Sequence, residues 1–231
     1  NQIVIEEKII GEEVSIMGFC NGSEISLMPQ SKDYKKIYDN DIGLNTGGMG
    51  SHAPVYILND KELEEIKIGM GLIVKQLNYK GILYAGVIKN NDGYYVLEFN
   101  CRFGDPECII ALSLLKTNFY TLCKNIINNT LQTNLEFKQT AMIGVYMVPN
   151  GYPKNPESFY DIYIDKTINE NNIYYDNIEH KNNHLYSLLS RTLLYLEEEE
   201  NLVHCYKKLY KNITKIHGNL FYRKDIGAKF L

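Results

Sequence analysis

Short runs of hydrophobic residues, separated by turn residues, fill the first part of the chain. They occupy residues 3–5, 14–19, 25–28, 82–88 and 94–99. Asn21-Gly22 separates two of these runs and is a strong signal for a β-hairpin, and residues 90–93 separate another two. The pattern therefore predicts antiparallel sheet. Between the hairpins, the polar and glycine-rich residues 31–54 predict a long loop, and loops of this length are often functional or disordered.

Helical periodicity, in which hydrophobic residues recur every three or four positions, covers residues 59–78 and 202–216. A third helix is expected to follow Asp105-Pro106-Glu107, because an aspartate cap, a proline at the first helical position and an acid in the first turn favour a helix start. We expect this helix to run through Leu115 and as far as Ile127.

The second part of the chain alternates hydrophobic runs with polar segments. Strands are predicted at residues 142–148, 160–164, 173–175 and 185–196. Residues 128–139 are polar and mark the candidate boundary between two units. The expected fold class is therefore α+β, with an antiparallel sheet and helices in residues 1–136 and a smaller α+β domain in residues 137–231.

Composition narrows the class of protein. The 231 residues are 45% hydrophobic and carry a net charge of -4, which excludes a disordered chain and argues against a nucleic-acid binder that acts by neutralising phosphates. Small substrates are favoured instead. The sequence has no apolar stretch long enough for a membrane span and no signal pattern, and its five cysteines form no Cys-x-x-Cys pair. A cytoplasmic protein is expected.

Glu98, Asn100 and Arg102 form the first candidate site. Side chains alternate between the two faces of a strand, so these three residues are expected on one face and Leu97 on the other. Mg²⁺ prefers carboxylate and amide oxygens together with substrate phosphates, and a guanidinium suits a phosphoryl or carboxylate group. The alternative is a polar stripe that faces solvent on an edge strand.

A glycine-rich loop is the second candidate. It consists of Asn45, Thr46, Gly47, Gly48, Met49 and Gly50. Its glycines allow the backbone N–H groups to approach a ligand and form an anion-binding nest, although by composition a flexible loop is about as plausible. Upstream, Asp33 and Lys35 lie two residues apart and could face a phosphosugar or an amine together; without context they would be a solvated charged loop.

The segment from Glu6 to Glu13 is the third candidate. An extended segment offers backbone donors and acceptors to the edge of an adenine ring, and a glutamate a few residues further on can accept both ribose hydroxyls. Taken alone, this pattern is weak evidence for a nucleotide site.

Together and in this order, these segments resemble the phosphoribosylamine-glycine ligase family, also called glycinamide ribonucleotide synthetases, of the ATP-grasp superfamily. The resemblance rests above all on Asn45 to Gly50, on Leu97 to Glu107 and on Arg223 to Gly227. It covers essentially the whole chain, which corresponds to about the C-terminal half of a family member. The chain also starts at Asn1 rather than Met, so we expect a fragment that does not complete a turnover by itself.

The resemblance implies a reaction of de novo purine synthesis. ATP phosphorylates glycine, and 5-phosphoribosylamine attacks the acyl phosphate to give glycinamide ribonucleotide, ADP and phosphate. The implied partners are these small molecules, with no nucleic acid or membrane, and further purine-pathway domains fused to the full-length protein are possible. The implied cofactors are ATP and Mg²⁺ or Mn²⁺.

The resemblance also implies a role for each candidate residue. Glu6, Glu7 and Ile9 would contact adenine, Glu13 the ribose, and Glu98 and Asn100 the metal ion. On the side of phosphoribosylamine and glycine would lie Asp33, Lys35, Arg102, Asp105 and residues 45–50. The chain departs from the family at residues 189–193, where a glycine-containing segment has lost its glycines. The alternative function is a non-catalytic ATP-grasp remnant that binds nucleotide or serves as an interaction module.

Overall fold

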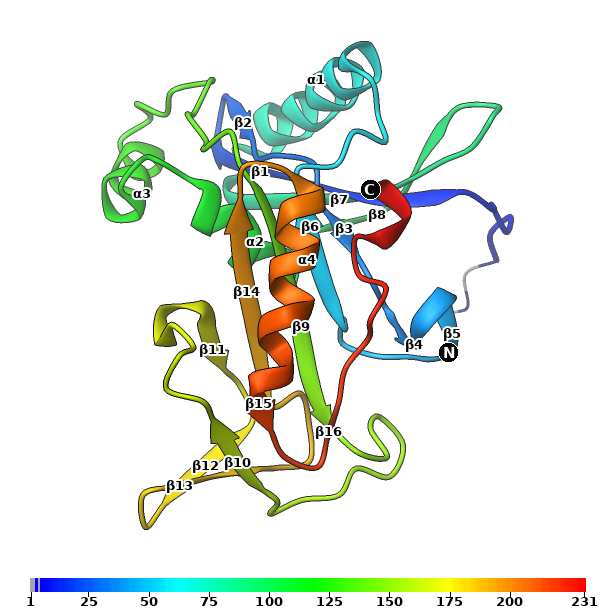
Figure 1. The fold of residues 1–231 in the computed structure, drawn as a ribbon. Coiled ribbons are helices and arrows are strands. Elements are labelled where there is room, and N and C mark those ends of the chain that lie inside the picture. Colours follow the sequence, from blue (N-terminus) through cyan, green and yellow to red (C-terminus); the bar gives the residue numbers. More distant parts are fainter. Residues whose placement is uncertain (1–2, 4) are drawn as a thin grey trace.

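The computed structural model describes residues 3 and 5–231 (Figure 1). A four-stranded antiparallel sheet in the order β2-β1-β7-β8 forms one part of it. Its strands are β1 (Glu12–Asn21), β2 (Ile25–Leu27), β7 (Lys80–Lys89) and β8 (Tyr94–Asn100). The hairpin between β1 and β2 is the one predicted from Asn21-Gly22, and Gly22 has the positive φ of 97° that such a turn requires.

Helices cover both faces of this sheet. Alternation along β1 sends Ile16 to the face that is covered by α1 (Asp60–Leu77), and Phe19 to the face covered by α3 (Phe119–Ile127). Helix α1 begins at the cap residue Asn59, whose side chain accepts a hydrogen bond from the backbone of Glu62, while the Glu62 side chain accepts one from the backbone of Asn59. This helix confirms the periodicity of residues 59–78.

The single helix expected after residue 105 is divided into α2 (Glu107–Leu114) and α3, which corrects the prediction of one helix. Leu115 is extended and forms an isolated β-bridge with Phe137, which ends α2. The side chain of Asn118 then accepts a hydrogen bond from the backbone of Thr121 and starts α3. A contact with Phe137, distant in the sequence, therefore overrides the local helix propensity.

A second antiparallel sheet has the order β11-β14-β9-β6-β3, with β16 also paired to β9. Its strands are β3 (Lys32–Asp33), β6 (Gly50–Ala53), β9 (Ala141–Pro149), β11 (Ile173–Tyr175), β14 (Leu193–Glu199) and β16 (Leu220–Phe221). Helix α4 (Leu202–Asn212) packs against β14 and β9, and α2 packs against β6 and β9 (Figure 1). Strand β9 is buried along its entire length. Since β3 and β6 lie before residue 136 and the other strands after it, this sheet joins both sides of the expected domain boundary, which stays a prediction.

The remaining strands are short. A third sheet contains β10 (Asp161–Ile164), β12 (Ile178–Lys181), β13 (His184–Ser187) and β15 (Ile216–His217), and β4 (Lys36–Tyr38) pairs with β5 (Ile42–Asn45). The strand expected at residues 185–196 is two strands, β13 and β14, which belong to different sheets. Ile3 and Ile5 of the strand expected at residues 3–5 belong to no strand, and Val4 lies outside the described residues. Among the described residues, no helix is both long and apolar enough to cross a membrane.

Candidate functional site

The candidate residues gather around a cavity of about 330 Å³ where the first sheet meets β3 of the second. It is lined by residues of four separate segments: Glu6, Glu13, Val14, Ser15, Asp33, Lys35, Tyr84, Gly86, Val87, Leu97 and Glu98. Larger cavities of about 770 and 670 Å³ lie elsewhere and contain none of the candidate residues. We therefore assign the site to the smaller cavity, because chemistry depends on the groups that line a space and not on its size.

Two carboxyl groups, those of Asp33 and Glu107, form the inner side of the site. Glu107 is 2% exposed and accepts hydrogen bonds from Ser15 Oγ at 2.8 Å and from Tyr84 Oη at 3.2 Å. Burial and, secondly, the nearby charge of Glu107 raise the pKa of Asp33 to about 8. Within the described part of the chain, Asp33 Oδ1 is buried without a hydrogen-bond partner. Asp33 can therefore hold a proton near neutral pH.

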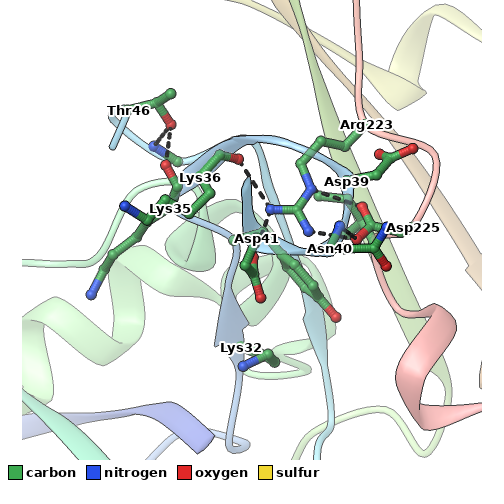
Figure 2. Close-up of polar contacts among 12 residues, drawn as sticks. Lys32, Lys35, Lys36, Asp39, Asn40, Asp41, Thr46, Arg223 and Asp225 are labelled. Atoms are coloured by element: carbon green, nitrogen blue, oxygen red, sulfur yellow. Dashed lines mark hydrogen bonds and ion pairs between the residues drawn. The ribbon is translucent and has the colours of Figure 1, made fainter. Parts of the chain in front are cut away.

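Lys35 supplies positive charge at the cavity. Its Nζ donates to Glu13 Oε2 at 2.8 Å. Burial opposes the charged form of Lys35, but the bond to Glu13 and the neighbouring carboxylates outweigh it and raise the pKa of the lysine. The backbone carbonyl of Lys35 accepts from both the N–H and the hydroxyl of Thr46 at 2.8 Å, which ties the lysine to the glycine-rich loop (Figure 2).

Glu98 and Asn100 share one face of β8, as the alternation predicts. Asn100 Nδ2 donates to Glu98 Oε1 at 3.0 Å. This bond uses the amide nitrogen, so Asn100 Oδ1 and the second Glu98 oxygen remain as donors to a cation. The described residues contain no group of three His, Cys, Asp or Glu side chains that could hold a metal by themselves. Two oxygen donors nevertheless fit Mg²⁺, which usually binds one or two protein oxygens together with phosphates and water.

The position of Leu97 corrects the simple alternation. The pairing of β8 with β7 shifts by one residue between Gly86 and Val87, so that Glu98 pairs with Gly86 and Val96 with Val87. Leu97 is the extra residue of this bulge and lines the cavity beside Glu98. It would have faced the other side of the sheet in a regular strand.

The backbone of the glycine-rich loop differs from the anion-binding nest considered from its composition. The N–H groups of Thr46 and Met49 donate to the carbonyls of Lys35 and Tyr34, both at 2.8 Å. The N–H groups of Gly47 and Gly48 donate to Tyr152 Oη at 3.3 Å and Thr46 Oγ1 at 3.0 Å. Because all four donors are used within the chain, they do not form a nest in this conformation.

Arg102 and Asp105 lie outside the lining of the cavity. The exposed Arg102 donates from Nη1 to the carbonyl of Phe103 at 2.8 Å. Asp105 Oδ1 accepts from Tyr146 Oη at 3.3 Å, and Asp105 Oδ2 forms an ion pair with Arg191. Arg191 is not among the site residues predicted from the sequence, although it lies within residues 189–193, which the resemblance marked as a departure from the family.

The segment expected to bind adenine, residues 6–9, has no regular secondary structure. Glu6 lines the cavity, whereas the exposed Glu7 and the half-buried Ile9 belong to no strand or helix. Glu13, at the start of β1, is held by Lys35. The site therefore brings Glu6, Glu13, Asp33, Lys35 and Glu98 together, and Asp105 joins the glycine-rich loop beside it.

Arg223 fixes the start of β4, directly after Lys35 in the chain (Figure 2). Its guanidinium is fully buried and donates to the carbonyl of Lys36 at 3.0 Å and to Asp41 Oδ1 at 2.8 Å. Two further donations reach Asp225, at 2.8 and 2.6 Å. Residues 223–227 thus hold the pair of strands β4 and β5 in place.

The chain matches known proteins over most of its length. Residues 1–108 match a family model described as the ATP-grasp (A) domain of phosphoribosylglycinamide synthetase, and residues 142–229 match the model of its C domain. The chain is 35% identical to phosphoribosylamine-glycine ligase of Methanosarcina barkeri over 99% of the chain and 55% of the relative. The enzyme of the same name from Methanocorpusculum labreanum is 37% identical over the same shares.

A solved structure shows the same fold. The phosphoribosylamine-glycine ligase of Thermotoga maritima superimposes with a TM-score of 0.85 at 30% identity, covering 96% of this chain and 57% of that one. The urea carboxylase of Kluyveromyces lactis, at 12% identity and a TM-score of 0.66, resembles it in fold alone. The chain spans about half the length of the relatives that it matches.

Proposed function

This chain belongs to the phosphoribosylamine-glycine ligase family and has an ATP-grasp fold, and on that basis we propose that it forms the metal-binding part of an enzyme that joins glycine to 5-phosphoribosylamine. In the proposed reaction, the glycine carboxylate takes the γ-phosphoryl group of ATP. The amine of 5-phosphoribosylamine then attacks the acyl carbon, and phosphate leaves. The products are glycinamide ribonucleotide, ADP and phosphate.

The nucleotide and metal side is formed by β1, β8 and the segment before β1. Glu98 and Asn100 would hold Mg²⁺ or Mn²⁺, and Glu6, Glu7, Ile9 and Glu13 would hold ATP. A bound divalent cation would neutralise charge on the transferred phosphoryl group. Glu98 lies at the cavity together with Glu6 and Glu13, which supports a shared role for these residues.

The substrate side is formed by Asp33, Lys35, Arg102, Asp105 and the glycine-rich loop. Lys35 offers positive charge to a phosphate or carboxylate. The attacking amine must lose a proton, and only the ionised fraction of Asp33, which grows as pH approaches its pKa of about 8, can accept it. We assign that proton to Asp33, whose Oδ1 has no hydrogen-bond partner among the described residues and can accept a hydrogen bond from a substrate nitrogen.

One observation carries the proposal: Glu13, Asp33, Lys35 and Glu98, which come from three separate segments, line one cavity. The first test measures Mg²⁺-dependent ATP binding by calorimetry for the chain and for Glu98→Ala. We expect the variant to lose the Mg²⁺-dependent part of the binding. Glu24→Ala, at an exposed turn, is the control and should bind like the unchanged chain.

The second test measures ADP release in a polypeptide of the relatives' full length that contains this chain. ADP release that needs both glycine and phosphoribosylamine, and that disappears in Glu98→Ala, would support the ligase. Nucleotide binding with no turnover by the full-length polypeptide would favour the non-catalytic remnant instead.

A further inference from the structure

Arg191 joins three parts of the molecule at the substrate side of the site. It lies between β13 and β14, and its side chain is 12% exposed. Its Nη1 donates to the carbonyls of Gly47, in a short contact, and of Gly48, at 3.4 Å. Its Nη2 pairs with Asp105 Oδ2. One guanidinium therefore contacts both the glycine-rich loop and the side chain of Asp105.

The surroundings fix the plane of this guanidinium. It lies over the ring of Tyr146, with 4.3 Å between Arg191 Cζ and the ring centroid, and its Nε faces Asp176 Oδ2 at 3.7 Å. Burial opposes the charge, but Tyr146, Asp105 and Asp176 raise the pKa of Arg191. A planar fork with several donors is suited to this geometry, and a lysine ammonium is not.

Asp105 and the loop are held as one unit. Each oxygen of the Asp105 carboxylate has a partner, Tyr146 for Oδ1 and Arg191 for Oδ2. Gly48 has a φ of 105°, and a side chain there would come within 3.0 Å of the Asp105 carbonyl. The backbone of residue 48 is therefore packed directly against residue 105.

We propose that Arg191 is a positioning residue for the substrates that bind beside the glycine-rich loop. It fixes the Gly47 and Gly48 carbonyls and the Asp105 carboxylate relative to each other, so that phosphoribosylamine and glycine meet them in one geometry. This inference rests on the proposed function. Arg191 makes no recorded contact, within the described residues, with the side chains assigned to ATP or metal, so ATP affinity is independent of it.

Steady-state kinetics of the full-length polypeptide test this role with Arg191→Lys and Arg191→Met. Because misplacement of about 1 Å can cost about 100-fold in rate, we expect the kcat/KM for phosphoribosylamine or glycine to fall about 10- to 100-fold in both variants. The KM for ATP should change less than about twofold. Lys207→Met, at an exposed position on α4, is the control for removal of a cation and should keep normal kinetics.

A second measurement on the 231-residue chain does not depend on activity. Hydrogen exchange at the amides of residues 46–49 should be faster in Arg191→Lys than in the unchanged chain, with little change in β9. Normal kinetics in Arg191→Lys, or an equal loss for all three substrates, would overturn the proposal. If the full-length polypeptide shows no turnover at all, the proposed function fails, and unchanged loop exchange would then overturn the positioning role separately.

Discussion

The buried carboxyl group of Asp33 should make the protein less stable as pH rises, and Asp33→Asn should remove this effect. The pKa of Asp33 is raised from 3.8 to about 8 in the folded protein, by burial and then by the charge of Glu107. The folded state therefore keeps its proton between about pH 4 and pH 8, whereas the unfolded chain releases it. The contribution of Asp33 to the free energy of unfolding is fully present below about pH 4 and is lost as pH rises toward 8.

The size of the effect follows from the two pKa values. At ~1.36 kcal/mol per pKa unit, the difference corresponds to roughly 5 kcal/mol between pH 4 and pH 8, as an upper limit because the carboxylate can recruit water or shift toward Lys35. Asparagine has the same shape and no charge, so Asp33→Asn should be about as stable as the unchanged chain at low pH. At pH 8 it should be more stable by several kcal/mol.

Urea unfolding at a series of pH values measures this difference directly. The free energy of unfolding of the unchanged chain and of Asp33→Asn should diverge steadily from pH 5 to pH 8. Asp92→Asn, in the exposed turn between β7 and β8, is the control for removal of an arbitrary carboxylate. Parallel curves for the unchanged chain and Asp33→Asn would refute the reasoning, because they would mean that Asp33 is ionised in the folded protein.

Four further substitutions test other parts of the structure. Arg223→Met should lower the free energy of unfolding by about 3 kcal/mol in urea titrations, because it leaves two aspartates without their buried cation. Gly48→Ala should lower the melting temperature, because φ is 105° and the new Cβ would lie 2.6 Å from a proline carbon. Gly69→Ala in α1 should raise the melting temperature, because its Cβ would meet nothing within 4 Å. Burial lowers the pKa of His52 to about 3, so the protein loses stability as pH falls below 6.5. At pH 5 this loss is about 2 kcal/mol, and His52→Phe should remove it in the same urea titrations.

Features that depend on neighbouring residues in the sequence could be predicted. The Asn21-Gly22 hairpin and helix α1 follow from turn chemistry and from a 3.6-residue period, and both are present. The shared face of Glu98 and Asn100 also follows from alternation. The position of Leu97 does not follow from alternation, because a bulge depends on the register of two strands, which the sequence of one strand does not reveal.

Features that depend on contacts between distant segments could not be predicted from periodicity. The break between α2 and α3 requires the bridge from Leu115 to Phe137. The grouping of Glu13, Asp33 and Glu98 required the family resemblance, because no spacing in the sequence places three separate segments at one cavity. Local patterns thus predicted many of the elements, whereas the expectation that these residues share a site came from the resemblance.

The pairing of β9 explains why Arg191 was missed. Gly50 at the end of the glycine-rich loop pairs with Val145, and Leu193, two residues after Arg191, pairs with Met147. Strand β9 therefore has the loop along one edge and the Arg191 segment along the other, and it is buried on both faces. Since Arg191 and Asp105 are 86 residues apart, no local pattern connects them.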